Sequence, residues 1–318
     1  PRHGVFFPPD TGLQNTDAEL ATNGVTTAYL AQNMSWEGGA RGVPAAEALV
    51  SALHDYRPHA RTDMRIQIRY ETHLIEGEEA LRAMIAAGDI GYVVFNNHLT
   101  DGFEMAKERP ERLAGWASLA GRTAAEHLAI MEAAAAREDE VQPMLARLTA
   151  LFAEKGLPSG SHDDRDAATR DRFHALGAKV CEFPMTRVAA ERARALGDPV
   201  LMGAPNVVRG GSMSGNVAAE ELVAAGLCDG LVSDYYAPAL AAAAWALLDR
   251  GVLDFAAAWR LVSSGPAAVM GLSDRGEIRV GTRADLVVVN PETRRISGVM
   301  AAGQGAHLAG DALTRLVG

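Results

Sequence analysis

The sequence predicts an α/β fold, a TIM-like (β/α)8 barrel with a small β-domain beside it. Two observations lead to this prediction: short β-type runs alternate with alanine-rich helical segments along most of the chain, and about one helical segment separates each pair of runs. Such alternation is typical of parallel strands joined by right-handed crossovers. With 318 residues, 48% of them hydrophobic, the chain can also enclose a large core.

Seven short apolar runs bounded by turn residues are predicted to be strands. They are residues 26–31, 64–70, 90–95, 158–161, 179–183, 200–202 and 231–233. The segments between them have helical periodicity and composition, and two more helical segments follow the last run. The predicted helices are residues 17–23, 45–55, 78–87, 123–155, 166–176, 188–196, 217–225, 239–248 and 255–263.

The chain divides into a predicted barrel, residues 1–270, and a predicted part of the small β-domain, residues 271–318. In the second part, residues 276–290 are expected to form two short strands, which need a further sheet partner to be stable. No partner is evident downstream. This ribbon, together with a count of seven strands instead of eight, leads us to expect a strand upstream of Pro1, so that both chain termini build the small domain.

The composition excludes several classes of protein. A net charge of −10 and a sequence pI near 5.4 argue against a protein that binds the phosphate backbone of nucleic acids. No apolar run reaches the roughly 18 residues of a membrane helix, and no signal peptide is recognisable. Cys181 and Cys228 are far apart and form neither a disulfide framework nor a cysteine metal cluster. We therefore expect a cytoplasmic protein with no nucleic-acid or membrane partner.

Polar side chains follow four of the predicted strands, and these are Glu71, His98, His162 and Asp234. In a barrel the carboxyl ends of the strands meet at one rim, so we expect these groups to lie close together. Each one alone has a structural explanation as a helix cap or a hydrogen-bonding residue. Together, imidazole nitrogen and carboxylate oxygen suit one or two divalent ions, with zinc favoured over manganese or iron.

A metal bound in this way would lower the pKa of a bound water toward neutrality and so generate a nucleophile. Asp234 is predicted to be the catalytic group that accepts the proton of this water and passes it to the leaving group. The predicted chemistry is hydrolysis.

The glycine-rich segment 203–216 is a candidate site for an anionic substrate. The amides of Gly210 and Gly211 could form a concave nest beside the Arg209 guanidinium. Further substrate-binding candidates are Ser212, Ser214, Asn216 and Tyr235, and Ser214 or Asn216 could also cap the next helix. The alternative is a glycine-rich connector with a helix cap. Weaker candidates, since most such charges are solvated at the surface, are Arg69, Lys107, Arg109, Arg165 and Arg170.

Five segments, "SHDD" (161–164), "CEFPMT" (181–186), "VLMGAPNVVRGGSMSGN" (200–216), "LVSDYY" (231–236) and "GEIRVGTRADLVVVN" (276–290), resemble the amidohydrolase superfamily. The resemblance implies a metal-dependent hydrolase of phosphonate metabolism that releases pyrophosphate from a ribosyl triphosphate carrying a 1-phosphonate. It also implies that Glu71, His98, His162 and Asp234 bind the metal. A further metal motif, His-x-His or His-x-Asp, is expected upstream of Pro1.

Met213 departs from the pattern of this family, in which a histidine is usual at that position. Two alternatives therefore stay open: an amidohydrolase that cleaves a C–N bond of a small amide or cyclic imide, and a barrel that binds an anionic sugar without catalysis. The expected partner is a small anionic phosphorylated substrate. A homodimer is expected from the general habit of such barrels.

Overall fold

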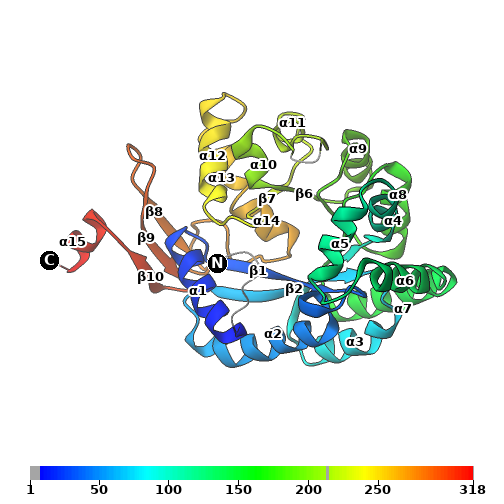
Figure 1. Ribbon diagram of the computed structural model, residues 1–318. Helices are drawn as coiled ribbons and strands as arrows, with labels where there is room; N and C mark the ends of the chain where they lie inside the picture. Colours follow the sequence, from blue (N-terminus) through cyan, green and yellow to red (C-terminus); the bar gives the residue numbers. More distant parts are fainter. Residues whose placement is uncertain (1–7, 213–214, 318) are drawn as a thin grey trace.

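The computed structural model describes residues 8–212 and 215–317. Its central element is a curled parallel sheet in the order β1-β2-β3-β4-β5-β6-β7, with helices around its outside (Figure 1). The strands are β1 (Thr27–Met34), β2 (Asp63–Glu71), β3 (Ile90–Asn96), β4 (Ser159–His162), β5 (Val180–Glu182), β6 (Val200–Gly203) and β7 (Gly230–Val232). All seven predicted strands and the α/β barrel type of fold are confirmed.

Helices connect successive strands and continue beyond β7. The α-helices are α1 (Pro9–Thr22), α2 (Val43–Tyr56), α3 (Glu78–Ala86), α4 (Leu99–Glu108), α5 (Pro110–Ser118), α6 (Ala124–Ala135), α7 (Glu138–Lys155), α8 (Ala167–Leu176), α9 (Arg187–Leu196), α10 (Ala204–Arg209), α11 (Ala219–Ala224), α12 (Ala239–Asp249), α13 (Phe255–Arg260), α14 (Ser264–Val269) and α15 (Asp311–Val317). Short 3-10 helices are η1 (Gly39–Arg41), η2 (Arg57–His59) and η3 (Ile75–Gly77). Within the described ranges, no helix combines the length and hydropathy needed to cross a membrane.

The predicted helix over 123–155 is two helices, α6 and α7. Thr123 and Glu126 form a reciprocal capping box that starts α6. The chain leaves the helical conformation at Arg137, and three acidic residues follow in the first turn of α7, where the helix dipole favours them. Helices α4, α5, α10, α14 and α15 were not predicted, and proline or glycine interrupts the sequences of the first four.

A separate antiparallel sheet in the order β10-β9-β8 is formed by β8 (Leu286–Val289), β9 (Ile296–Ala301) and β10 (Gln304–Leu308). The expectation for residues 276–290 was wrong in two respects, because only β8 in this range is a strand and its partner β9 lies downstream. Among the described residues, the N-terminal part of the chain contributes a helix to this region: Ala21 of α1 packs against Val299 and Ala301. The boundary at residue 270 stays a prediction.

Strand β2 illustrates the two faces of the large sheet. Ile66, Ile68 and Tyr70 belong to the hydrophobic core that includes residues of the surrounding helices. The alternate residue Gln67 donates a hydrogen bond to Glu182 of β5, although β3 and β4 lie between the two strands in the sheet. Because alternate side chains of a strand point to opposite faces, Gln67, Arg69 and Glu71 face the concave interior of the curled sheet.

Candidate active site

Polar side chains meet at the carboxyl ends of the strands, and the first pair is Glu71 with His98. Glu71 ends β2 and is buried, while His98 follows β3 and precedes α4. The backbone N–H of His98 donates to Glu71 Oε2 over 3.1 Å, and His98 Nδ1 contacts Glu71 Oε1. Burial alone would raise the pKa of Glu71, but hydrogen bonding to His98 and its charge lower it below the ordinary value. The pair is thus built to hold a negative carboxylate.

Glu37 joins this pair, and the sequence analysis missed it. One ligand atom from each of Glu37, Glu71 and His98 lies within 4.8 Å of the others, which makes them a candidate Glu–Glu–His metal site. Glu37 is also buried and accepts hydrogen bonds from Arg41 over 2.8 Å and from the indole of Trp116. The rule that polar groups follow strands could have found it, but the strand was predicted to end at residue 31 and β1 continues to Met34.

His162 belongs to a second cluster on β4 and β5. Its Nδ1 lies 2.8 Å from Oε1 of Glu182, a buried carboxylate that also accepts from Gln67 Nε2 over 3.1 Å. Its Nε2 lies 3.4 Å from Asp163. Burial alone would raise the pKa of Glu182, but His162 lowers it below the ordinary value. Glu182 was also missed, because it lies inside a predicted strand.

Asp234 follows β7 with a left-handed backbone, at φ 53°. Its side chain is exposed at the rim, yet the partial loss of solvent around the carboxyl group raises its pKa. Asp163 after β4 and Phe183 after β5 are left-handed as well, at φ 59° and 56°. For a bulky residue such as Phe183 this conformation is uncommon and costs energy. Unusual backbone geometry therefore accompanies the carboxyl ends of three strands.

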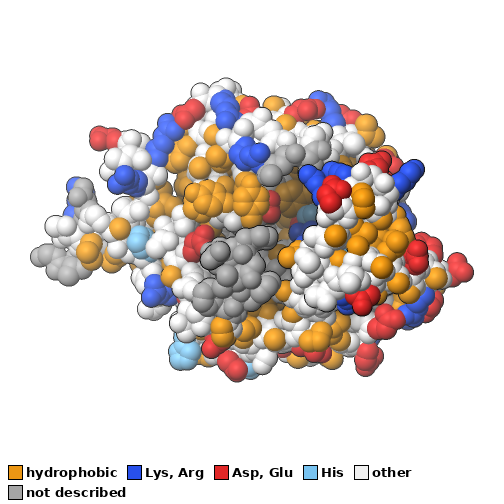
Figure 2. All heavy atoms as spheres, in the orientation of Figure 1, with side chains coloured by type: hydrophobic (Ala, Val, Ile, Leu, Met, Phe, Trp, Pro, Cys, Tyr) orange, Lys and Arg blue, Asp and Glu red, His pale blue; other side chains and the backbone are white. Residues whose placement is uncertain are grey.

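The predicted site residues meet in part. His98 and His162 line the same cavity of about 100 Å³, between the ends of β3 and β4. Asp234 does not line this cavity, although the charges of His162 and Glu182 act on its carboxyl group. Figure 2 shows a hollow near the middle of one face of the molecule, with acidic, basic and histidine side chains inside it.

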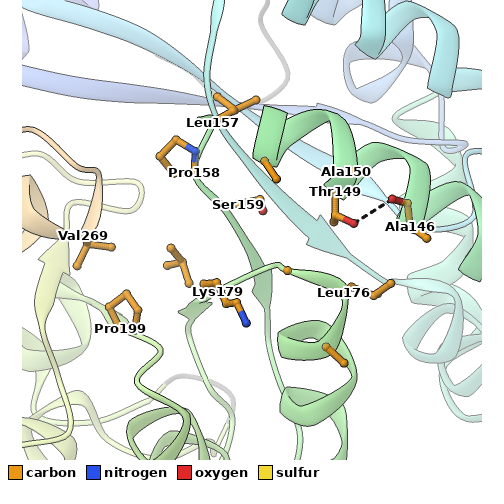
Figure 3. A pocket seen from close by; sticks show the side chains of 14 residues that line it. Ala146, Thr149, Ala150, Leu157, Pro158, Ser159, Leu176, Lys179, Pro199 and Val269 are labelled. Atoms are coloured by element: carbon orange, nitrogen blue, oxygen red, sulfur yellow. Dashed lines mark hydrogen bonds between the residues drawn. The ribbon is translucent and has the colours of Figure 1, made fainter. Parts of the chain in front are cut away.

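A larger cavity of about 570 Å³ lies at the opposite end of the strands, where β4 and β5 begin (Figure 3). Its lining is mostly alanine, leucine, valine and proline, and the hydroxyl of Thr149 is bonded to the carbonyl of Ala146 in its own helix. Its one cationic lining residue, Lys179, donates to the carbonyl of His174 over 3.0 Å. The cavity offers no convergent reactive groups, so we place the candidate site at the carboxyl ends.

The segment 203–216 differs from the expected amide nest. Ala204–Arg209 is helix α10, and the amides of Gly210 and Gly211 both donate to the carbonyl of Asn206 over 3.1 Å. The prediction of a ligand-binding amide nest is therefore wrong, because these amides close the end of a helix and are not available to a ligand.

At the start of α11 the amide of Ala219 donates to the side-chain oxygen of Asn206 over 3.0 Å, so the expected cap by Asn216 was wrong, whereas the cap by Ser214 stays a prediction. Arg209 and Tyr235 are exposed, and Ser212 and Asn216 are half-buried. Met213 and Ser214 lie outside the described residues.

The donor chemistry of these clusters fits a divalent metal. Buried carboxylates and imidazoles are ligands for zinc, manganese and iron. His162 has the arrangement usual for a metal-binding histidine, in which a carboxylate holds one ring nitrogen and the other remains for the metal. Both oxygens of Glu37 accept hydrogen bonds from Arg41, just as both oxygens of Glu71 contact His98.

Comparison with known proteins gives two matches in sequence. The profile of the amidohydrolase family matches residues 11–298. The alpha-D-ribose 1-methylphosphonate 5-triphosphate diphosphatase of Escherichia coli (strain K12) is 33% identical over 304 residues, which cover 93% of this chain and 80% of that protein.

Solved structures with the same fold are more distant in sequence. N-acetylglucosamine-6-phosphate deacetylase from Pasteurella multocida has a TM-score of 0.60 at 11% identity, covering 95% of this chain and 82% of its own. D-hydantoinase from Bacillus sp. AR9 has a TM-score of 0.59 at 13% identity, covering 96% of this chain and 82% of its own. At such identities the likeness shows the fold alone.

Proposed function

Because the chain belongs to the amidohydrolase family, we propose that it is a metal-dependent diphosphatase that releases pyrophosphate from a ribosyl triphosphate carrying a phosphonate at C1. The observation that supports this most strongly is the 33% identity, over nearly the whole chain, to a diphosphatase whose substrate is a ribose 1-methylphosphonate 5-triphosphate. The cluster of buried carboxylates and imidazoles at the strand ends supplies the groups that a hydrolase of this family needs.

In this proposal Glu71, His98, His162 and Asp234 hold the metal. A bound divalent ion supplies a Lewis acid and a nucleophilic water at neutral pH. The protein supplies the orientation: Glu71 fixes the His98 ring through Nδ1, and Glu182 fixes the His162 ring through Nδ1. This leaves His162 Nε2, which lies 3.4 Å from Asp163, as the candidate ligand atom. Asp234 would accept the proton of the attacking water on its carboxylate and pass it to the leaving group.

The substrate-binding assignments are also part of the proposal. Arg209, Ser212, Asn216 and Tyr235 follow the carboxyl ends of β6 and β7 in sequence, and this position supports their assignment to the substrate. Glycines 210 and 211 contribute the turn that ends α10. The homodimer stays a prediction.

The experiment is a product assay on the purified full chain supplied with zinc, manganese or iron(II). Release of pyrophosphate from the ribosyl 1-phosphonate 5-triphosphate is the expected result, and the same preparation with Glu71→Gln controls for contaminating phosphatases. N-acyl amino acids and a cyclic imide are assayed in parallel. Amide or imide cleavage without pyrophosphate release would overturn the proposed substrate and retain the family chemistry.

A further inference from the structure

Arg69 lies inside the curled sheet, where a charged side chain needs an explanation. It occupies β2 between Gln67 and Glu71, on the concave face. Gln67 contacts Glu182, and Glu71 contacts His98. Arg69 is therefore flanked on its own strand by residues that belong to the two clusters of the candidate site.

The charge of Arg69 acts on both clusters. Burial raises the pKa of the carboxyl groups of Glu71, Glu182 and Asp234, and the positive charge of Arg69 is one of the contributions that lower it. The same charge acts on His98. This agrees with its place on β2, between Gln67, which contacts Glu182, and Glu71, which contacts His98.

Arg69 nevertheless has a guanidinium nitrogen, Nε, that lacks a hydrogen-bond partner among the described residues. Its Nε–H is shielded from solvent and donates to no residue within 8–212 or 215–317, and no ion pair joins it to a residue in those ranges. Buried polar groups are almost always hydrogen-bonded, so an unpaired donor at a site calls for a ligand or a special role. By contrast, Arg65, four residues earlier on the same strand and face, pairs with Asp63 over 3.0 Å.

We propose that Arg69 binds a phosphoryl oxygen of the substrate, and of the pyrophosphate that leaves, between the two clusters. This inference rests on the proposed diphosphatase function. A guanidinium presents several N–H donors in a fixed plane and matches the oxygens of a phosphoryl group bidentately, which a lysine ammonium cannot do. Arg69 would thus supply, from the barrel interior, the anion contact that the amides of Gly210 and Gly211 do not provide.

The alternative is that Arg69 only neutralises the surrounding carboxylates. The two roles differ in what they require of the side chain. Neutralisation needs one positive charge, which lysine retains, whereas phosphoryl binding needs the planar fork as well. The substitution Arg69→Lys therefore separates the two roles, and Arg69→Gln removes both.

The test is calorimetric titration of the purified full chain with inorganic pyrophosphate, comparing the unaltered protein with Arg69→Lys, Arg69→Gln and Arg65→Gln. Arg65→Gln is the matched control, because it removes the same side chain from the same face of the same strand. Melting temperature and metal content are measured for each preparation, so that lost folding or lost metal is recognised.

We expect Arg69→Gln to weaken pyrophosphate binding about 30-fold and Arg69→Lys about 5- to 10-fold, as for loss of a charge-assisted contact, and Arg65→Gln to leave it unchanged. Unchanged affinity in a folded, metal-containing Arg69→Lys protein would overturn the proposal, as would equal losses in Arg65→Gln and Arg69→Gln. The proposed function fails by a different result, the absence of pyrophosphate release by the unaltered protein.

Discussion

The two ends of strand β2 carry the same types of residue in different arrangements. At the amino end, Asp63 accepts from Arg65 over 3.0 Å and from Arg275 over 2.6 Å, so its charge is fully paired. At the carboxyl end, Arg69 has no ion pair within the described ranges, and Glu71 holds His98. The charges at the amino end of β2 are therefore paired with one another. At its carboxyl end, Arg69 has no ion pair among the described residues, and Glu71 belongs to a candidate metal site.

This difference indicates that the two ends of the barrel have different roles, stability at the amino ends of the strands and chemistry at the carboxyl ends. Arg275 lies in the segment between α14 and the small sheet, and it also donates to the hydroxyl of Thr27 on β1. The amino-end ion pairs thus connect the large sheet to the segment that leads to the small one. In barrels of this type the carboxyl ends carry the chemistry and the amino ends contribute stability. The predictions below test whether activity and stability separate in this way.

The largest effect is expected for Glu71→Gln. This change keeps the shape of the side chain but removes the charge that faces His98 and the proposed metal site. We expect activity to fall by about 10³-fold, equal to ~4 kcal/mol of transition-state stabilisation. Metal content, measured by mass spectrometry of the purified protein, should fall in parallel. A stable protein that has lost its metal would agree with a functional role for the carboxyl end of β2. Full activity would contradict the assignment of Glu71 as a ligand.

A smaller effect is expected for Glu182→Gln. Glu182 acts through His162, and substitution of such outer partners usually lowers metal affinity or activity about 10- to 100-fold. Metal titration and pyrophosphate assays measure both quantities. The matched control is Glu138→Gln, which removes an exposed carboxylate that lies 2.8 Å from another histidine, His73. A loss as large as that of Glu71→Gln would instead make Glu182 a direct ligand.

The large sheet could be predicted because its strands are strongly patterned. Residues 90–95, for example, form an apolar run bounded by turn residues, and β3 (Ile90–Asn96) follows it closely. Strands β9 and β10 could not be predicted in the same way, since glycines and alanines dilute their patterns. Helix α10 was not predicted, because glycines flank it and a proline lies in its first turn. The carbonyl of Asn206 accepts from the amides of Gly210 and Gly211, and these hydrogen bonds show that the helix ends at Gly210.

The candidate site could be predicted only where a polar residue directly follows a predicted strand end. His98 and His162 follow well-defined strands and line one cavity. Glu37 and Glu182 were missed because errors of a few residues in strand ends put them outside the inspected positions. Arg69 was only a weak candidate, because the sequence does not show that the sheet curls and brings β2 within reach of β5.

The amino end of β2 gives the smallest predicted effect, and it concerns stability. Asp63→Asn would leave Arg65, Arg275 and Arg283 without their shared carboxylate. We expect a loss of about 2 kcal/mol in the free energy of unfolding at neutral pH, with pyrophosphate release per folded molecule unchanged. Asp249→Asn is the control, because its ion pair with Arg294 is solvent-exposed and such pairs contribute about 0 to 1 kcal/mol.

The pH dependence of this effect has a definite sign. Burial alone would raise the pKa of Asp63, but hydrogen bonds from Arg65 and Arg275 outweigh it and lower the pKa below its ordinary value. A carboxyl group with a lowered folded-state pKa stabilises the protein above its unfolded pKa, about 3.9, and loses this contribution as the pH falls through the folded value. The difference in melting temperature between the unaltered protein and Asp63→Asn should therefore be constant near neutrality and shrink below about pH 4. A difference that grows in acid would show that Asp63 is not stabilised as a charged group, and the two ends of β2 would then differ less than their contacts indicate.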